Sequence, residues 1–145
     1  MSEDRDIDLE ILRRRKLLEL MRGKRRETEA PLIVEVKSLR EFEEWVTRAG
    51  REGKAVFVDF WAPWCAPCLM MAPVYERVAE KFRGRAYFLK VNVDELPELA
   101  SRFVVFSIPT ILAMCGGREV SSLVGYRPAL MIESWVSKVV SSCQG

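Results

Sequence analysis

Two cysteines, Cys65 and Cys68, are separated by two residues in the segment Trp-Cys-Ala-Pro-Cys. At this spacing the two sulfur atoms can switch between a dithiol and a disulfide with little movement of the backbone. An apolar, β-branched run at 55–60 precedes the pair, and a helix-like stretch from Cys68 to about residue 82 follows it. A CxxC pair that connects a strand to a helix start is typical of a redox-active site.

The predicted position of Cys65 at a helix start should activate its thiol. The unpaired N–H groups and the positive end of the helix macrodipole both favour a thiolate there. The thiolate is the species that attacks in disulfide exchange, so we expect Cys65 to be the nucleophile. Cys68, one turn into the helix, should be more buried and should resolve the mixed disulfide that Cys65 forms with a substrate.

A structural zinc site is the alternative for this pair. Tetrahedral zinc needs four ligands. The chain has no histidine, and its other two cysteines, Cys115 and Cys143, lie far apart without forming a second CxxC. The sequence therefore favours redox chemistry, and we expect no metal site.

The elements that must position the two cysteines follow from the spacing of apolar residues. Gly116-Gly117 is a strong hairpin signal, Ser38 and Glu41 form a capping box, and Pro128 is typical of a first helical turn. The predicted strands are 32–36, 55–60, 86–93, 110–114 and 119–124, and the predicted helices begin near 38, 68, 97 and 128. This order predicts an α/β fold with a central mixed β-sheet and helices on both of its faces.

The sequence predicts a charged, helical extension at residues 1–30, ahead of a globular domain at 31–145. The apolar residues that recur at helical spacing are Ile7, Ile11, Leu18 and Met21. Between residues 13 and 26 there are eight basic residues and one acidic residue. Such a segment can be a solvated helix, dock on the domain, self-associate, or bind an acidic partner or nucleic acid. On charge alone we do not expect a nucleic-acid partner.

The segment at 58–68 resembles the active-site segment of the thioredoxin family; in this chain it reads Val-Asp-Phe-Trp-Ala-Pro-Trp-Cys-Ala-Pro-Cys. Further motifs in the family's order and at its spacing are Met-Ala-Pro at 71–73, Leu-Lys-Val-Asn-Val-Asp at 89–94, Ser-Ile-Pro-Thr at 107–110 and Val-Gly at 124–125. Several motifs in register over about residues 32–141 are hard to obtain by chance. The resemblance implies the thioredoxin fold, preceded here by one extra helix.

Asp59 is an acidic residue within an apolar strand, where burial would raise the pKa of its carboxyl group. By resemblance to the family it lies beneath Cys68 and takes up or supplies, through water, the proton of the resolving step. Lys90 resembles the family lysine that pairs with this acid, and a simple strand-edge lysine is the alternative. These two residues complete the predicted catalytic set with the two cysteines.

Pro109 resembles the family's cis-proline, which faces the active disulfide. A cis bond there would expose the backbone of Ile108 for pairing with an extended substrate and would keep metals away from the dithiol. The other residues of the predicted docking surface are Pro63, Trp64, Phe106 and Gly125. The residues expected to support the pair are Trp61, Ala66, Pro67 and Pro73, with a mainly core role as the alternative for Trp61.

Three positions depart from the family's pattern. Leu69 stands where many thioredoxins have lysine, Phe106 where a charged residue is frequent, and Val104 where glycine is frequent. The first two make the docking face more apolar, which would change the substrates that it accepts.

Ala-Pro also replaces the common Gly-Pro between the cysteines. In oxidising relatives a histidine between the two cysteines often stabilises the dithiol form. This chain has no histidine at that position, which favours a reducing potential.

Cys115 and Cys143 form a second candidate pair. In the implied topology the hairpin tip and the end of the last helix share the pole away from the active site. Asn92 and Gln144 are the only side-chain amides and 30% of the residues are charged, a thermophile-like composition that chance in a short chain can also produce. Intracellular proteins of hyperthermophiles carry structural disulfides, so we take a Cys115–Cys143 bond as a hypothesis.

The sequence thus predicts a thiol–disulfide oxidoreductase that reduces protein disulfides and is itself reduced by a thioredoxin reductase or a similar donor. No nucleotide-binding fingerprint is present, so we expect no bound cofactor. A net charge of +2, no long apolar run and no secretory-type apolar stretch favour a cytoplasmic protein without a membrane partner. A disulfide oxidant or isomerase, and an adaptor that recruits a partner through its basic helix, are the alternative functions.

Overall fold

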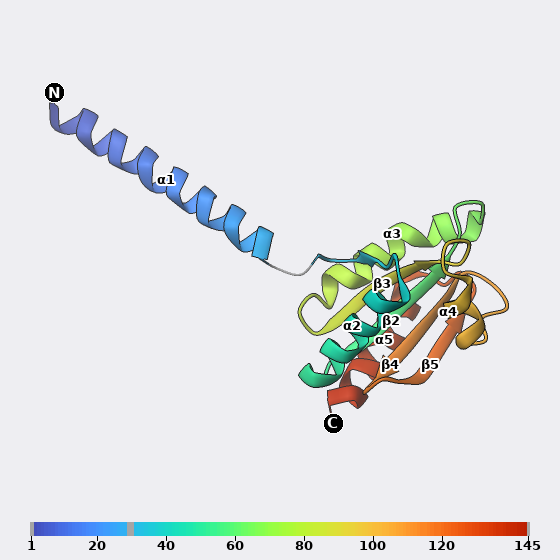
Figure 1. Ribbon diagram of the computed structural model, residues 1–145. Coiled ribbons are helices and arrows are strands. Elements are labelled where there is room, and N and C mark those ends of the chain that lie inside the picture. The colour runs from blue at the N-terminus through green and yellow to red at the C-terminus, as the bar shows by residue number, and fades with distance from the viewer. Residues whose placement is uncertain (1, 29–30, 145) are drawn as a thin grey trace. The chain divides into compact units, whose positions relative to one another are not determined.

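The computed structural model describes residues 2–28 and 31–144, which divide into two compact units on either side of the boundary between residues 31 and 32. The second unit contains a sheet and its flanking helices (Figure 1). Its strands are β1 (Val34–Glu35), β2 (Ala55–Trp61), β3 (Ala86–Asn92), β4 (Thr110–Cys115) and β5 (Arg118–Val124). Its helices are α2 (Leu39–Glu52), α3 (Ala66–Lys81), α4 (Pro97–Arg102) and α5 (Ala129–Gln144).

The strands of the described residues form one mixed sheet in the order β1-β3-β2-β4-β5. β3 pairs in parallel with β1 and β2, whereas β4 pairs antiparallel with β2 and β5. The turn between β4 and β5 places Gly116 and Gly117 at φ of +58° and +79°, the left-handed values that a type I′ hairpin needs. In this strand order β2 is the central strand, and its carboxyl end leads directly to the two cysteines.

Side chains of the central strand alternate between two cores, one on each face of the sheet. Phe57 belongs to the core that β2 shares with α3 and α5. Val58 belongs to the core that β2 shares with α2 and α4. Asp59 has the same parity as Phe57, so this carboxyl group points toward the face that α3 covers. Helices thus cover both faces of the sheet, as the sequence predicts.

Two elements begin about two residues away from the start that the sequence predicts. The first strand, expected over 32–36, is reduced to β1, because Leu32 and Ile33 pack against the α3–α5 core instead of pairing. The active-site helix begins at Ala66 rather than at Cys68. Cys65 itself is the cap of this helix, and a proline in the first turn suits a helix start.

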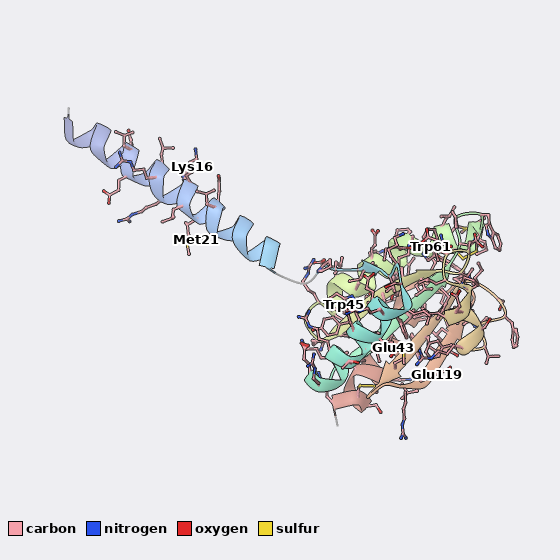
Figure 2. All side chains as sticks on the ribbon, viewed as in Figure 1. Lys16, Met21, Glu43, Trp45, Trp61 and Glu119 are labelled. Carbon is pink, nitrogen blue, oxygen red and sulfur yellow. A yellow bond between two sulfur atoms is a disulfide. The ribbon has the colours of Figure 1, made fainter. Side chains whose placement is uncertain are left out.

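The helix of the first unit is α1 (Ser2–Thr28). The apolar side chains described on it are 45–60% exposed and surround the helix instead of forming one stripe. They are Leu9, Ile11, Leu12, Leu17, Leu18, Leu20 and Met21. Lys16 and Met21 project from opposite sides of α1 in Figure 2. The side chain of Ile7 lies outside the described residues, and so does residue 30, where the extension is expected to end.

A disulfide joins Cys115, at the end of β4, to Cys143, in the last turn of α5. The two Cα atoms are 5.6 Å apart, and the residues are separated by 28 positions in the chain. Both side chains are partly buried against the α3–α5 core. The crosslink therefore ties the hairpin to the C-terminal helix and closes a loop that restricts the unfolded chain.

Removal of this crosslink in the variant Cys115→Ala/Cys143→Ala should lower the free energy of unfolding of the oxidised protein by about 3.5 kcal/mol, because the unfolded chain regains the entropy of the closed loop. Urea titration measures the change. Ser142→Ala, at an exposed position beside the crosslink, is the control and should leave the midpoint unchanged. Alkylation of both thiols in wild-type protein purified without reductant would contradict the proposed bond.

Candidate active site

Cys65 and Cys68 lie at the N-terminus of α3 and form a disulfide with an S–S distance of 2.29 Å. Cys65 is the N-cap of the helix, and its Sγ atom accepts a hydrogen bond of 3.2 Å from the backbone N–H of Cys68. Both cysteines are buried: Cys65 is 6% exposed and Cys68 is 2% exposed. This N–H group and the helix macrodipole both act on the Cys65 sulfur, so the geometry favours a thiolate there after reduction.

A second segment reaches Cys65 from the loop before β4. The Ile108–Pro109 peptide bond is cis, and the carbonyl oxygen of Ile108 lies 3.8 Å from Sγ of Cys65. Gly125 donates its backbone N–H to the carbonyl oxygen of Pro109 at 2.7 Å, with a φ of +88° that suits glycine. The small apolar cluster at the site, called here the cysteine cluster, consists of Ala62, Cys65 and Cys68, with Trp61, Val93 and Ile108 packed against it.

Two tryptophans flank the cysteines and are held by carboxylates. Trp64 is 69% exposed, and its indole N–H donates to the Asp94 carboxylate at 2.9 Å. Trp61 is half-buried against the cysteine cluster, and its indole N–H donates to the Glu35 carboxylate at 3.1 Å. Trp64 therefore offers a fixed, exposed ring beside Cys65, whereas Trp61 serves the packing beneath it.

The residues on either side of the pair are open to solvent. Pro63 is exposed, Ala66 and Pro67 form the exposed first turn of α3, and Pro73 lies inside that helix. Leu69, where many thioredoxins have lysine, is 52% exposed. The rim of the site at the start of α3 is therefore largely uncharged.

The loop after α4 carries the other two departures from the family pattern. Phe106 is 92% exposed, an unusual state for a phenylalanine. Val104 is 61% exposed and has a φ of +56°. A β-branched residue in this left-handed region is strained, and glycine is not, which explains why glycine is frequent at this position.

Asp59 is almost completely buried, with 1% exposed, and neither carboxylate oxygen has a hydrogen-bond partner among the described residues. Burial raises the pKa of Asp59 from 3.8 to about 7. The nearby charge of Lys90 lowers this pKa, and that of Glu35 raises it, but burial is the largest of the three effects. A carboxyl group in this state can take up and release a proton near neutral pH.

Lys90 is the register partner of Asp59 on β3. Because β3 lies between β1 and β2, the alternative of a strand-edge lysine is wrong. The ammonium nitrogen lies 4.4 Å from the centroid of the Trp61 ring, and no ion pair joins it to Asp59 in the part of the chain that the structure describes. The positive charge of Lys90 therefore lowers the pKa of Asp59 without direct contact, and its ammonium group contacts the Trp61 ring instead.

Glu35 and Asp94 belong to the site although the sequence analysis does not assign them to it. Each carboxylate accepts the indole N–H of one of the two tryptophans. Asp94 stands in a family-like motif, which is a usable signal in the sequence. Glu35 stands in a short strand far from the cysteines in the chain, and only the pairing of β1 with β3 places it beside Trp61.

Comparison with known proteins agrees with the geometry. The family model described as Thioredoxin matches residues 33–138. The chain belongs to the thioredoxin family. It is a thiol–disulfide oxidoreductase, and Cys65 and Cys68 are its CxxC pair. Disulfide substrates and a thioredoxin reductase are the general partners of this family.

Individual thioredoxins are similar over most of the domain. A thioredoxin from Alicyclobacillus acidocaldarius subsp. acidocaldarius is 48% identical over 87 residues, which are 60% of this chain and 83% of that protein. The chloroplastic thioredoxin M4 of Arabidopsis thaliana is 37% identical over 105 residues, which are 72% of this chain and 54% of that protein. The crystal structure of a thioredoxin from Nicotiana alata matches with a TM-score of 0.69 at 32% identity, over 77% of this chain and 95% of that one. The predicted thioredoxin fold is confirmed.

Two further findings concern the described residues of both units. No helix within residues 2–28 and 31–144 is long and apolar enough to cross a membrane. Across the same residues, no cluster of three or more histidine, cysteine, aspartate or glutamate side chains could hold a metal ion.

The raised pKa of Asp59 predicts how stability depends on pH. The folded protein keeps a proton on Asp59 that the unfolded chain has lost, so the free energy of unfolding should fall as pH rises from about 4 to about 7. The total loss should be about 4 kcal/mol, at about 1.4 kcal/mol per pH unit. Asp59→Asn removes this group, so the variant should be more stable than the wild type at pH 8 and about equal to it at pH 4.

Urea titrations of the oxidised proteins across this pH range measure the effect without titration of the active-site thiols. Glu76→Gln, which changes an exposed carboxylate on α3, is the matched control and should keep the slope of the wild type. Equal pH dependence in Asp59→Asn and wild type would show that Asp59 does not titrate near neutral pH.

Proposed function

We propose that this protein is a protein-disulfide reductase in which Cys65 is the nucleophile and Cys68 the resolving thiol. The observation that carries the proposal is the position of the Cys65 sulfur. It receives the N–H of Cys68 at the start of α3 and lies 3.8 Å from the Ile108 carbonyl oxygen beside the cis bond. One thiol is thus activated at a surface where a substrate backbone can pair.

In the first step the Cys65 thiolate attacks one sulfur atom of a substrate disulfide. The substrate S–S bond breaks as a new S–S bond to Cys65 forms, and the second substrate sulfur leaves as a thiolate that takes a proton from solvent. The N–H of Cys68 stabilises the attacking thiolate at the helix terminus. The product of this step is a mixed disulfide between Cys65 and the substrate.

In the second step Cys68 gives its proton to the Asp59 carboxylate through water, and its thiolate attacks Sγ of Cys65. The mixed disulfide breaks, the first substrate sulfur leaves as a thiolate, and the Cys65–Cys68 disulfide forms. That sulfur takes a proton from solvent, and Asp59 then returns the proton of Cys68 to solvent. In all, the substrate gains two electrons from the dithiol and two protons from solvent, and the protein is left with the Cys65–Cys68 disulfide. The pKa of about 7 supports Asp59 as the proton acceptor, and Lys90 tunes it as a positioning residue.

Substrate binding is proposed for the exposed residues around Cys65. The backbone of Ile108 pairs with an extended substrate segment beside Pro109, in the manner of strand addition. The Trp64 ring, fixed by Asp94, provides an apolar contact next to the nucleophile. The remaining contacts of this surface are assigned to Pro63, Phe106 and Gly125.

We propose a reducing direction for the reaction and a thioredoxin reductase, or a donor of the same chemistry, as the source of electrons. The lack of a histidine between the cysteines supports a reducing potential. The proposed compartment is the cytoplasm, where thiols are kept reduced. Residues 31–145 are the proposed catalytic domain, and residues 1–30 a helical extension to it.

An adaptor function through α1 is the second candidate. It is favoured by the seven exposed apolar side chains of that helix and by the basic residues between positions 13 and 26. In this function the redox pair is dispensable for partner binding, so a partner bound equally well by Cys65→Ser would identify it.

The proposed mechanism predicts a trapped intermediate in Cys68→Ser. The reduced variant should attack a protein disulfide through Cys65 and then stop, because no second thiol resolves the mixed disulfide. Mass spectrometry without reductant should find the substrate bound to Cys65, and turnover should fall by several orders of magnitude.

Two variants serve as controls for this trap. Cys65→Ser should form no adduct, and Cys115→Ala/Cys143→Ala, which removes the distant pair, should keep the turnover of the wild type. An adduct on Cys68 in Cys65→Ser, with none on Cys65 in Cys68→Ser, would reverse the assigned roles.

A further inference from the structure

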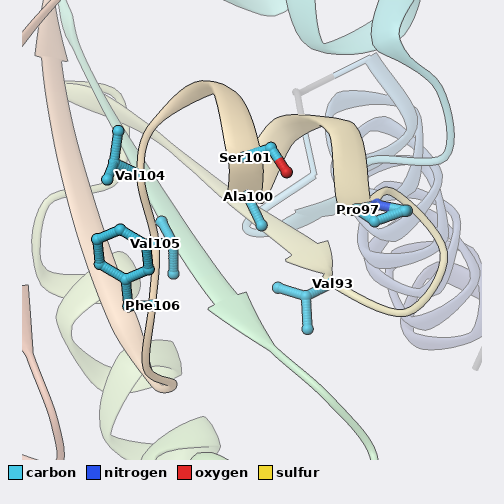
Figure 3. A pocket seen from close by; sticks show the side chains of 7 residues that line it. All are labelled: Val93, Pro97, Ala100, Ser101, Val104, Val105 and Phe106. Carbon is cyan, nitrogen blue, oxygen red and sulfur yellow. The ribbon is translucent and has the colours of Figure 1, made fainter.

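Exposed apolar surface occurs in both units of the chain. In the second unit, α4, the loop at 104–106 and Val93 line an open pocket of about 450 Å³ (Figure 3). Phe106 in this loop is already assigned to the substrate surface, so the pocket belongs to the reaction described above. In the first unit, seven exposed apolar side chains lie on α1, and the reaction does not use them.

α1 has no second element to pack against within its own unit. It has 27 residues and is the one helix or strand that the structure describes in residues 2–28. An isolated helix is only marginally stable in water, and helices in proteins gain most of their stability from packing an apolar face. A second helix packed along α1 would bury part of its apolar surface and stabilise it.

Four of the seven apolar side chains share one side of α1. At 3.6 residues per turn they fall within an arc of about 120°, whereas Leu9, Leu12 and Leu20 lie outside it. The four are Ile11, Leu17, Leu18 and Met21, which are 45–58% exposed. Ile11, Leu18 and Met21 also have the spacing of seven and three residues that is typical of a seam between two packed helices.

The charged residues described within this arc compensate each other. They are Glu10 and Arg14, and the guanidinium of Arg14 pairs with the Glu10 carboxylate at 3.3 Å, one turn earlier in the helix. Neither residue therefore needs a counter-charge from the surface that covers the arc. The arc can accept an apolar partner surface in spite of these two charges.

The sequence of α1 separates its charges along the helix. Residues 3–10 contain five acidic residues and one basic residue, and residues 13–26 contain eight basic residues and one acidic residue. In an antiparallel pair of identical helices the acidic start of each copy lies along the basic end of the other, and two-fold symmetry makes this contact twice. A parallel pair would place like charges side by side and Arg14 against the Arg14 of the second copy.

The same separation of charges disfavours other occupants of the arc. An anionic membrane or a nucleic acid would attract the basic part of α1 but repel its acidic start. A uniformly acidic protein surface would do the same. The charges of α1 are therefore complementary to those of α1 itself.

We propose that α1 is a self-association helix, which pairs with α1 of a second copy of this chain in antiparallel orientation. The interface is the arc of four apolar side chains. In this alignment Ile11 lies opposite Met21 of the second copy, and Leu17 lies close to the two-fold axis. Leu9, Leu12 and Leu20 stay outside the interface.

This pairing joins two reductase domains without altering either one. A helix of 27 residues is about 40 Å long, and the domain of each copy continues from the carboxyl end of its helix. In an antiparallel pair these two ends lie at opposite ends of the interface, so the pair needs no contact between the domains. Each domain keeps its own CxxC pair, and turnover per active site should not depend on dimer formation.

Sedimentation equilibrium of the full-length, oxidised protein tests the proposal. At micromolar concentrations the wild type should have twice the mass of one chain. Leu18→Glu should raise the dissociation constant at least about a hundredfold, since each dimer loses two buried leucines and gains two charges in the interface. Turnover per active site should stay that of the wild type.

Leu12→Glu is the matched control. It makes the same change on the same helix, at a leucine that is 59% exposed and lies outside the arc. The dissociation constant of this variant should stay within about threefold of the wild-type value, because a surface substitution away from a contact changes the free energy by about 0.5 kcal/mol or less.

Crosslinking tests the orientation of the pair. In the background Cys65→Ala/Cys68→Ala, one sample carries Ile11→Cys and another carries Met21→Cys, and the two samples are mixed and mildly oxidised. The new cysteines should link mainly between the two variants. Identical positions of an antiparallel pair in this alignment are about 15 Å apart along the axis, which is beyond the reach of a disulfide. Mass spectrometry of the linked peptides identifies the positions joined.

Four results would overturn the proposal. A protein that stays a monomer at every concentration would remove the second copy as the occupant. Co-sedimentation of that monomer with vesicles of phosphatidylcholine and phosphatidylserine would assign α1 to a lipid surface instead. A dimer that persists in Leu18→Glu would place the interface outside the arc, and links between two copies of Ile11→Cys would show a parallel pair. Each of these results leaves the reductase function intact, which the trapped mixed disulfide tests separately.

Discussion

The hydrogen bond from the backbone N–H of Cys68 to the sulfur of Cys65 is the interaction on which the site depends. It exists because β2 delivers the chain to the first turn of α3, where N–H groups have no partner within the helix. The packing of α3 against the sheet holds this terminus in place. The loop with the cis Ile108–Pro109 bond then brings a second backbone to the same sulfur. The activating N–H group and the backbone that we propose to pair with a substrate therefore meet at one atom.

The buried Asp59 illustrates how the fold gives up stability for chemistry. A carboxyl group with no hydrogen-bond partner in an apolar core is costly when it is charged. The fold keeps it on the face of the sheet covered by α3 and moderates its pKa with the field of Lys90. An apolar residue at this position would pack more favourably but could not accept the proton that we propose the resolving thiol releases.

Much of this arrangement can be predicted from the sequence, because the signals are local. The CxxC spacing, the run at 55–60 and the Gly116-Gly117 turn each determine structure within a few residues. The contacts of Glu35 with Trp61 and of Lys90 with the same ring depend on the pairing of strands far apart in the chain. The pocket beside α4 also requires three segments to meet, so no single stretch of sequence reveals it.

A redox titration of the Cys65–Cys68 pair tests the central claim most directly. The purified protein is equilibrated in defined thiol buffers, and the state of each cysteine is read by alkylation and mass spectrometry. We expect one two-electron transition with a potential of about −270 mV, the value characteristic of thioredoxins. A potential of about −180 or −120 mV, typical of an isomerase or an oxidant, would contradict the reducing direction. The absence of any transition at this pair would contradict the redox function as a whole.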